Sequence, residues 1–94
     1  MELEWDRTKA ATNLAKHGVS FREAAEAFLD PHRVVARDIR HSTARETRWF
    51  CFGVVQGRVL TVRFTMRGER IRVFGAGAWR EGQRRYEQAH GQGL

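Results

Sequence analysis

Hydrophobic positions near the start of the chain follow helical spacing. The segment DRTKAATNLAK begins at Asp6 and has an apolar edge made by Ala11, Leu14 and Ala15. An aspartate before such an edge is typical of an N-cap, and a glycine after it is typical of a helix end. The pattern predicts a short helix that starts after Asp6 and stops at Gly18.

A second helical pattern follows and is more regular. Its apolar residues lie at the i, i+3, i+4, i+7 and i+8 positions of one buried face, namely Phe21, Ala24, Ala25, Phe28 and Leu29. Pro31 closes the pattern because proline lacks the amide hydrogen that a continuing helix needs. We therefore predict a second amphipathic helix that ends before Pro31.

The sequence KHGVSF between these two helices has the signals of a tight corner. Gly18 suits the left-handed backbone position that ends a helix. Ser20 and Glu23 match the Ser-x-x-Glu capping box of the next helix, with Val19 placed as a hydrophobic staple. His17 lies in the last helical turn, where the helix dipole favours positive charge. A structural role is predicted for His17, and acid–base catalysis is the alternative because imidazole exchanges protons near neutral pH.

From residue 47 the hydrophobic pattern changes to period two. The segments TRWFCFGVV, RVLTVRFTM and RIRVFG are three strand candidates, and HRVVARDI is a fourth that precedes them. The links Gln56-Gly57 and Arg67-Gly68 are as short as those of antiparallel hairpins. RHSTARE supplies a polar, exposed connection between the fourth candidate and the other three.

The chain returns to a helical pattern after GAGAW, where Trp79, Gln83 and Tyr86 form one stripe. The sequence thus predicts one α+β domain over residues 1–94, with two N-terminal helices, an antiparallel sheet of three to four strands and one C-terminal helix. The tail, residues 90–94, is expected to be disordered.

The composition adds a strong positive charge, since 17 Lys and Arg residues stand against 11 Asp and Glu residues for a net charge of +6. Such a charge favours a polyanionic or acidic partner. Cys51 is the single cysteine and there is no HExxH motif, so we expect no metal, no cofactor and a reducing, cytoplasmic location. No apolar run approaches the roughly 20 residues of a membrane span, which argues against a membrane partner.

Strand alternation gathers arginines on one side of the predicted sheet. One face receives the apolar residues Leu60, Val62, Phe64 and Met66. The other face receives the patch Arg63, Arg67, Arg70 and Arg72. Like charges across a sheet repel, and Glu69 is the one acid nearby in sequence, so the patch favours an anionic ligand. The alternative is an ordinary water-facing side of an antiparallel sheet.

The closing helix carries aromatic and basic side chains together in WREGQRRYEQAH. A base can stack on Trp79 or Tyr86 while arginine binds the phosphate, as proteins commonly hold single-stranded RNA. The alternative is that both rings cover the sheet as the apolar stripe of the helix. RNA can also be cleaved without a metal, through its own 2′-hydroxyl, when an acid, a base and cations surround the phosphate.

Several segments together resemble the BrnT family of toxin–antitoxin systems. They are EWDRTKAATNLAKHGVSFREAAEAFLD, a His-Ser connection, ETRWFCFGVV, the RVLTVRFT strand, RIRV and a final RRYE, which span about residues 4 to 87. The resemblance implies a bacterial or archaeal ribonuclease toxin with a RelE-like fold, acting on messenger RNA and so inhibiting translation. It also implies a hetero-oligomer with a BrnA-like ribbon-helix-helix antitoxin, through which the complex binds operator DNA.

From these observations we select candidate site residues. The catalytic candidates are Arg63, Arg67, Arg72, Tyr86 and His17, and the RNA-binding candidates are Arg70, Trp79, Arg80 and Arg84. The sequence departs from the family pattern at Gly77, where an arginine is expected. Two alternative functions stay open, namely a non-catalytic basic module that binds an acidic antitoxin or nucleic acid, and a basic domain without a nucleic-acid role.

Overall fold

The computed structural model describes residues 2–91. Three α-helices, one 3-10 helix and five strands lie in this part of the chain. In chain order they are β1 (Glu2–Trp5), α1 (Arg7–His17), α2 (Phe21–Ala25), the 3-10 helix η1 (Glu26–Leu29), β2 (Val34–Arg37), β3 (Arg48–Val55), β4 (Arg58–Arg67), β5 (Arg70–Gly77) and α3 (Arg80–Ala89). The predicted α+β class with three α-helices is thus confirmed.

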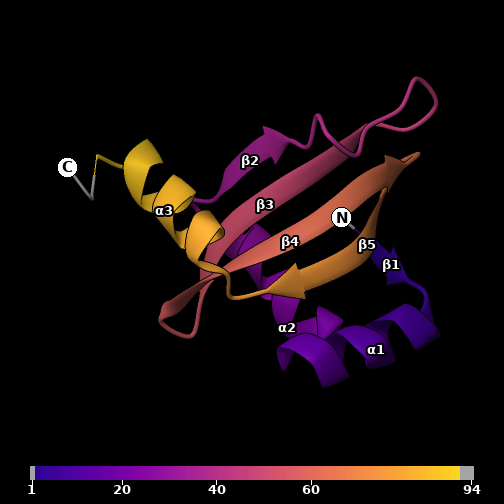
Figure 1. Ribbon diagram of the computed structural model, residues 1–94, viewed down its shortest axis with the longest axis horizontal. Coiled ribbons are helices and arrows are strands. Elements are labelled where there is room, and N and C mark those ends of the chain that lie inside the picture. Colours follow the sequence, from indigo (N-terminus) through magenta and orange to yellow (C-terminus); the bar gives the residue numbers. More distant parts are fainter. Residues whose placement is uncertain (1, 92–94) are drawn as a thin grey trace.

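The five strands form one mixed sheet in the order β1-β5-β4-β3-β2 (Figure 1). The four strands β2 to β5 pair antiparallel as predicted, but β1 pairs parallel with β5. The prediction of an antiparallel sheet with three to four strands was therefore wrong, because it missed the parallel strand β1. The missed strand has four residues and joins a partner almost seventy residues away, so no turn signal marks it. RelE-likeness stays a prediction.

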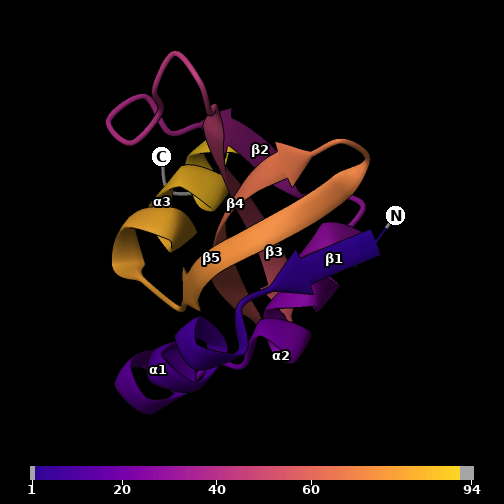
Figure 2. The same ribbon diagram turned by 90° about the vertical axis from the view of Figure 1, so that its right-hand side faces the viewer.

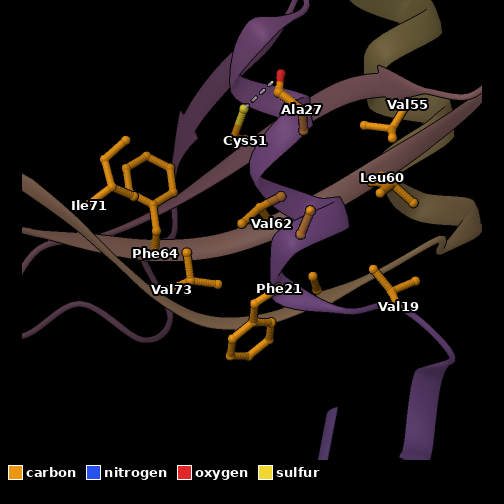
Figure 3. Packing of buried hydrophobic residues seen from close by; sticks show 12 residues of the cluster. Val19, Phe21, Ala27, Cys51, Val55, Leu60, Val62, Phe64, Ile71 and Val73 are labelled. Atoms are coloured by element: carbon orange, nitrogen blue, oxygen red, sulfur yellow. Dashed lines mark hydrogen bonds between the residues drawn. The ribbon is translucent and has the colours of Figure 1, made fainter. Parts of the chain in front are cut away.

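The helices cover different parts of the sheet (Figure 2). Helices α2 and η1 pack on one face, where buried residues of β3, β4 and β5 complete a core with Val19, Phe21, Ala24 and Ala27 (Figure 3). Helix α3 lies on the opposite face and packs on β3 and β4. A large part of that second face is left without a helix, and this part holds the candidate site.

The corner between α1 and α2 agrees with the predicted capping signals. Asp6 accepts a hydrogen bond from the backbone amide of Lys9, and Gly18 ends α1 with a φ of 68°. Ser20 Oγ accepts from the backbone amide of Glu23 at 2.9 Å. Among residues 2–91 the Glu23 carboxylate makes no return bond to Ser20 that would complete the capping box, and it pairs instead with Arg58 of β4.

The second predicted helix changes type after its first turn, which corrects its buried face. Phe21, Ala24 and Ala27 are buried at a spacing of three, whereas Leu29 is 79% exposed. A 3-10 helix has three residues per turn, so this spacing keeps one face toward the core and turns Leu29 outward. The tight turn also brings the Ala27 backbone against Gly53 of β3, where any side chain at position 53 would collide with it.

The closing helix is confirmed, but its buried stripe differs from the prediction. Gly82 and Tyr86 are buried and Gln83 is exposed. A side chain at position 82 would overlap Thr61 of β4, so glycine allows α3 to lie close to the sheet. His90 and Gly91 form a turn after α3, and the remainder of the tail predicted as disordered lies outside the described residues.

Candidate nucleic-acid interface

The strand register brings the predicted arginine patch together on one face of the sheet. Arg67 pairs with Arg70, and Thr65 pairs with Arg72, so the side chains of both pairs share a face. Arg48 of β3 pairs with Thr65 and lies on the same face. We call this surface the basic face; its residues are Arg48, Phe50, Arg63, Thr65, Arg67, Arg70, Arg72 and Phe74.

Acidic side chains from β1 border the basic face. Arg70 lies 3.3 Å from Glu2 and 3.6 Å from Glu4, and Arg72 donates to Glu4 at 2.8 Å. The hydrogen bond from Arg72 lowers the pKa of the Glu4 carboxyl. Glu69 is the one acid nearby in sequence, and the parallel strand brings in two more acids from the start of the chain.

Arg63 and Arg67 keep their charge uncompensated: within residues 2–91 neither forms an ion pair. The Arg63 guanidinium lies over Gly75 of β5, where a Cβ atom would be 3.2 Å from Nε and from Nη2. Because glycine has no side chain, position 75 leaves room for the Arg63 guanidinium. Both arginines are exposed and available to an anion.

Sequence reasoning missed two neighbours of Arg63. Phe74 continues the alternation of Arg70 and Arg72 on the basic face, and an irregularity in the β4–β5 register then brings Gly75 opposite Arg63. The Arg48 guanidinium lies 4.0 Å from the centroid of the Phe74 ring, and the Lys9 amine lies 5.5 Å from it. Arg48 and Phe74 are both in phase with the alternation of their strands and could have been found from it, whereas the bulge has no such signal.

The end of the basic face near α3 is closed by packed side chains. The Trp79 indole occupies the place that a side chain at Gly77 would take, and it meets the His17 ring edge-on at 5.1 Å between centroids. Arg85 lies over the Phe52 ring at 4.9 Å. His17 and Trp79 thus link α1 to the start of α3, which agrees with a structural role for His17. Arg80 is exposed at the first position of α3.

Two further candidates make contacts away from the arginines. The Tyr86 hydroxyl donates to Asp30 Oδ2 at 2.8 Å, and burial together with this carboxylate raises the pKa of Tyr86 to about 12. Arg84 pairs with Glu81 at 2.7 Å on the exposed surface of α3. Neither side chain contacts another candidate, and their assigned roles stay predictions.

The Cys51 thiol is buried in the core and contacts the Ala27 carbonyl oxygen at 3.9 Å (Figure 3). Burial raises the pKa of Cys51 to about 12, so it is not an activated nucleophile. Among residues 2–91, no group of three or more His, Cys, Asp or Glu side chains could hold a metal ion. No helix in that range is long and apolar enough to cross a membrane.

The opposite face of the sheet has a different character. An apolar groove opens where α2 and η1 leave the sheet uncovered, and it is lined by Leu3, Phe28, Leu29, Val35, Phe64 and Met66 among others. Glu26 and Arg33 are its charged lining residues. The two faces of one sheet are therefore chemically distinct, one basic and aromatic and the other apolar.

A protein-family model described as "Ribonuclease toxin, BrnT, of type II toxin-antitoxin system" matches residues 5–82. The comparison with curated proteins gives no match. The matched range includes every arginine of the basic face and ends within the first turn of α3. Glu2 and Glu4 of β1 lie before the matched range, and Tyr86, which contacts Asp30, lies after it.

Proposed function

Because the chain belongs to the BrnT family of ribonuclease toxins from type II toxin–antitoxin systems, we propose that it is a metal-independent endoribonuclease that binds single-stranded RNA on its basic face. The observation that carries this proposal is that, among residues 2–91, Arg63 and Arg67 are exposed without an ion-pair partner on a face that also holds the half-buried ring of Phe74. Guanidinium groups bind phosphate through two parallel hydrogen bonds, and aromatic rings stack on unpaired bases.

The proposed reaction uses the substrate's own 2′-hydroxyl. Its oxygen attacks the adjacent phosphorus while the bond to the 5′-oxygen breaks, which gives a 2′,3′-cyclic phosphate and a free 5′-hydroxyl. Extra negative charge develops on the phosphate oxygens in the transition state, and preformed cations stabilise it. Arg63 and Arg67 have the free charge for this role, while Arg72 is held in place by Glu4.

We further propose how the activity is used and restrained. Cleavage of messenger RNA in the cytoplasm would inhibit translation. A type II family implies a protein antitoxin, and we assign this partner to the BrnA-like ribbon-helix-helix class, which forms a hetero-oligomer with the toxin and carries it to operator DNA. The positive charge of the chain favours an acidic antitoxin surface.

The test is cleavage of a defined single-stranded RNA by the purified chain, with and without EDTA. We expect cleavage under both conditions. The cleavage rate of Arg63→Ala should be about 100-fold lower, because one cation that stabilises the transition state is lost. Arg33→Ala is the matched control, since it removes an exposed arginine that lines the apolar groove on the opposite face of the sheet. Cleavage that disappears with EDTA, or that is insensitive to Arg63→Ala, would contradict the proposal.

One observation favours the alternative of a non-catalytic binding module. The indole of Trp79 fills the place beside Gly77 where the family resemblance expects an arginine. The phosphate site then has one cation fewer than expected. Expression in a host without the antitoxin gene separates the two functions, because a ribonuclease arrests growth and a binding module does not.

A further inference from the structure

A histidine and an aspartate are paired in the connection between β2 and β3, which spans residues 38–47. His41 Nδ1 lies 2.8 Å from Asp38 Oδ2, and the backbone amide of His41 donates to Asp38 Oδ1 at 3.3 Å. Asp38 is 5% exposed, whereas the His41 side chain is 53% exposed. Within residues 2–91, the second ring nitrogen of His41 makes no hydrogen bond. A buried carboxylate thus orients an imidazole that is half exposed and whose other nitrogen is unbonded within that range.

The connection is held firmly to the first residue of β3. The Ser42 hydroxyl donates to the Asp38 carbonyl oxygen at 2.7 Å and accepts from the Arg48 amide at 2.8 Å. The Asp38 amide donates in turn to the Arg48 carbonyl oxygen at 2.8 Å. These bonds fix the position of the histidine relative to the sheet without using its ring.

The pair lies at the edge of the basic face. Asp38 is bonded to Arg48, Arg48 pairs with Thr65, and Thr65 pairs with Arg72 in one row across the sheet. Neighbouring strands are about 4.8 Å apart, so Asp38 is one strand from Arg48 and about two strands from β4. The Arg48 guanidinium extends across to Phe74, beside the place that Arg63 occupies.

Figure 2 shows the same relation in space. The connection between β2 and β3 and helix α3 project from the same side of the sheet, and α3 packs on β3 and β4. The connection therefore stands beside the surface that we assign to RNA. The connection itself carries Arg40, Arg45 and Glu46 besides Asp38. Glu46 Oε1 lies 2.9 Å from Nε of Arg48 at the start of β3.

We propose that His41 is the general base that accepts the 2′-hydroxyl proton, and that Asp38 is its positioning residue. This inference rests on the proposed function. In the step, Nε2 of His41 takes the proton, the 2′-oxygen forms its bond to phosphorus, and the 5′-oxygen leaves and takes a proton from water. The imidazolium then returns its proton to solvent, so the group is restored after each cleavage.

The other histidines have contacts that suit this role less well. His17 packs edge-on against Trp79, and His90 stacks on Tyr86 with 4.4 Å between ring centroids. The Nδ1 atom of the His32 ring lies 3.9 Å from Asp30 Oδ1, beyond hydrogen-bond distance, and His32 precedes β2 whereas Asp38 follows it. His32 is therefore a matched control, because it is an exposed histidine beside an aspartate but at the other end of β2 from Asp38 and Arg48.

The experiment compares His41→Ala and His32→Ala with the wild-type chain in EDTA. We expect His41→Ala to cleave RNA at least about 100-fold more slowly, which is the usual contribution of a general base. Added imidazole should restore part of that rate, and affinity for an uncleavable 2′-deoxy analogue should be unchanged. His32→Ala should cleave at the wild-type rate. His41→Asn, which keeps a similar volume, is measured as a second variant in case the alanine variant does not fold.

Asp38→Asn tests the positioning role. We expect kcat to fall while KM changes little, because the imidazole stays in place without its anionic partner. Wild-type cleavage rates in both His41 variants, or a loss that imidazole does not restore and that is accompanied by loss of binding, would overturn the inference and leave the ribonuclease proposal intact. A wild-type chain that cleaves no RNA would overturn both.

Discussion

Asp30 shows how a single residue can organise one end of the molecule. Its carboxylate accepts hydrogen bonds from the backbone amides of His32 and Val54 and from the Tyr86 hydroxyl. Burial opposes ionisation of Asp30, but these three donors outweigh it and lower the pKa of the carboxyl. The sequence offered Tyr86 as a catalytic candidate because it is an aromatic residue beside arginines, whereas the contact that its hydroxyl makes in the structure is a structural one.

The pH dependence of stability follows from this cluster. The pKa of an unfolded aspartate is about 3.9, so the stability contributed by Asp30 is present above about pH 4 and is lost as pH falls through the lower folded value. We expect Tyr86→Phe to lower the free energy of unfolding by about 1–2 kcal/mol at pH 7. The difference from wild type should shrink as pH falls from 4 toward 2, as measured by urea unfolding. A difference that stays constant over this range would contradict the assignment.

The junction between β5 and α3 is the feature that matters most at the scale of elements. The backbone leaves β5 at Gly77, and Trp79 folds its ring back over that glycine to meet α1 at His17. Glycine at position 77 and tryptophan at position 79 therefore depend on each other. A larger side chain at 77, arginine included, needs the indole to move.

We expect Gly77→Ala to destabilise the fold by about 1–3 kcal/mol, because the added methyl group overlaps the indole. In a Trp79→Ala background the same change should cost much less, since the overlapping ring is gone. A double-mutant cycle from thermal or urea unfolding measures the difference. Equal costs in the two backgrounds would show that the two positions do not interact.

At the scale of the whole molecule, the sheet separates two kinds of surface. Within residues 2–91, one face carries Arg63 and Arg67 without ion-pair partners, and the other has an apolar groove that Arg33 helps to line. The positive side chains behind the net charge of +6 therefore differ in their surroundings from one face to the other. Removal of a positive charge should therefore weaken nucleic-acid binding when the charge lies on the basic face and not when it lies beside the apolar groove.

The salt dependence of binding measures this asymmetry. Each phosphate contact with a single strand contributes about −0.7 to the slope of log K against log salt concentration. We expect Arg63→Ala to reduce the magnitude of the slope by about 0.7, and Arg33→Ala to leave it unchanged. Fluorescence anisotropy with an uncleavable 2′-deoxy oligonucleotide provides the titrations. Equal slopes for the two variants would place the nucleic acid elsewhere.

The elements that the sequence predicted correctly are those with local signals. The cap at Asp6, the corner at Gly18 and the two hairpins need a few neighbouring residues each. At the first hairpin, Gln56 and Gly57 both have positive φ, as a two-residue type I′ turn requires. The second hairpin turns at Gly68 and Glu69, one residue later than predicted, because Arg67 still pairs with Arg70.

Strand alternation and turn chemistry act over short distances, so they were enough to predict the α+β class and the gathering of four arginines, while the resemblance of several motifs predicted the family. The parallel pairing of β1, which brings Glu2 and Glu4 to Arg70 and Arg72, became visible in the folded chain alone. The same holds for the bulge that brings Gly75 opposite Arg63 and for the placing of the His41 and Asp38 pair beside Arg48. These contacts join residues distant in sequence or depend on a register irregularity, and neither leaves a periodic trace in the chain.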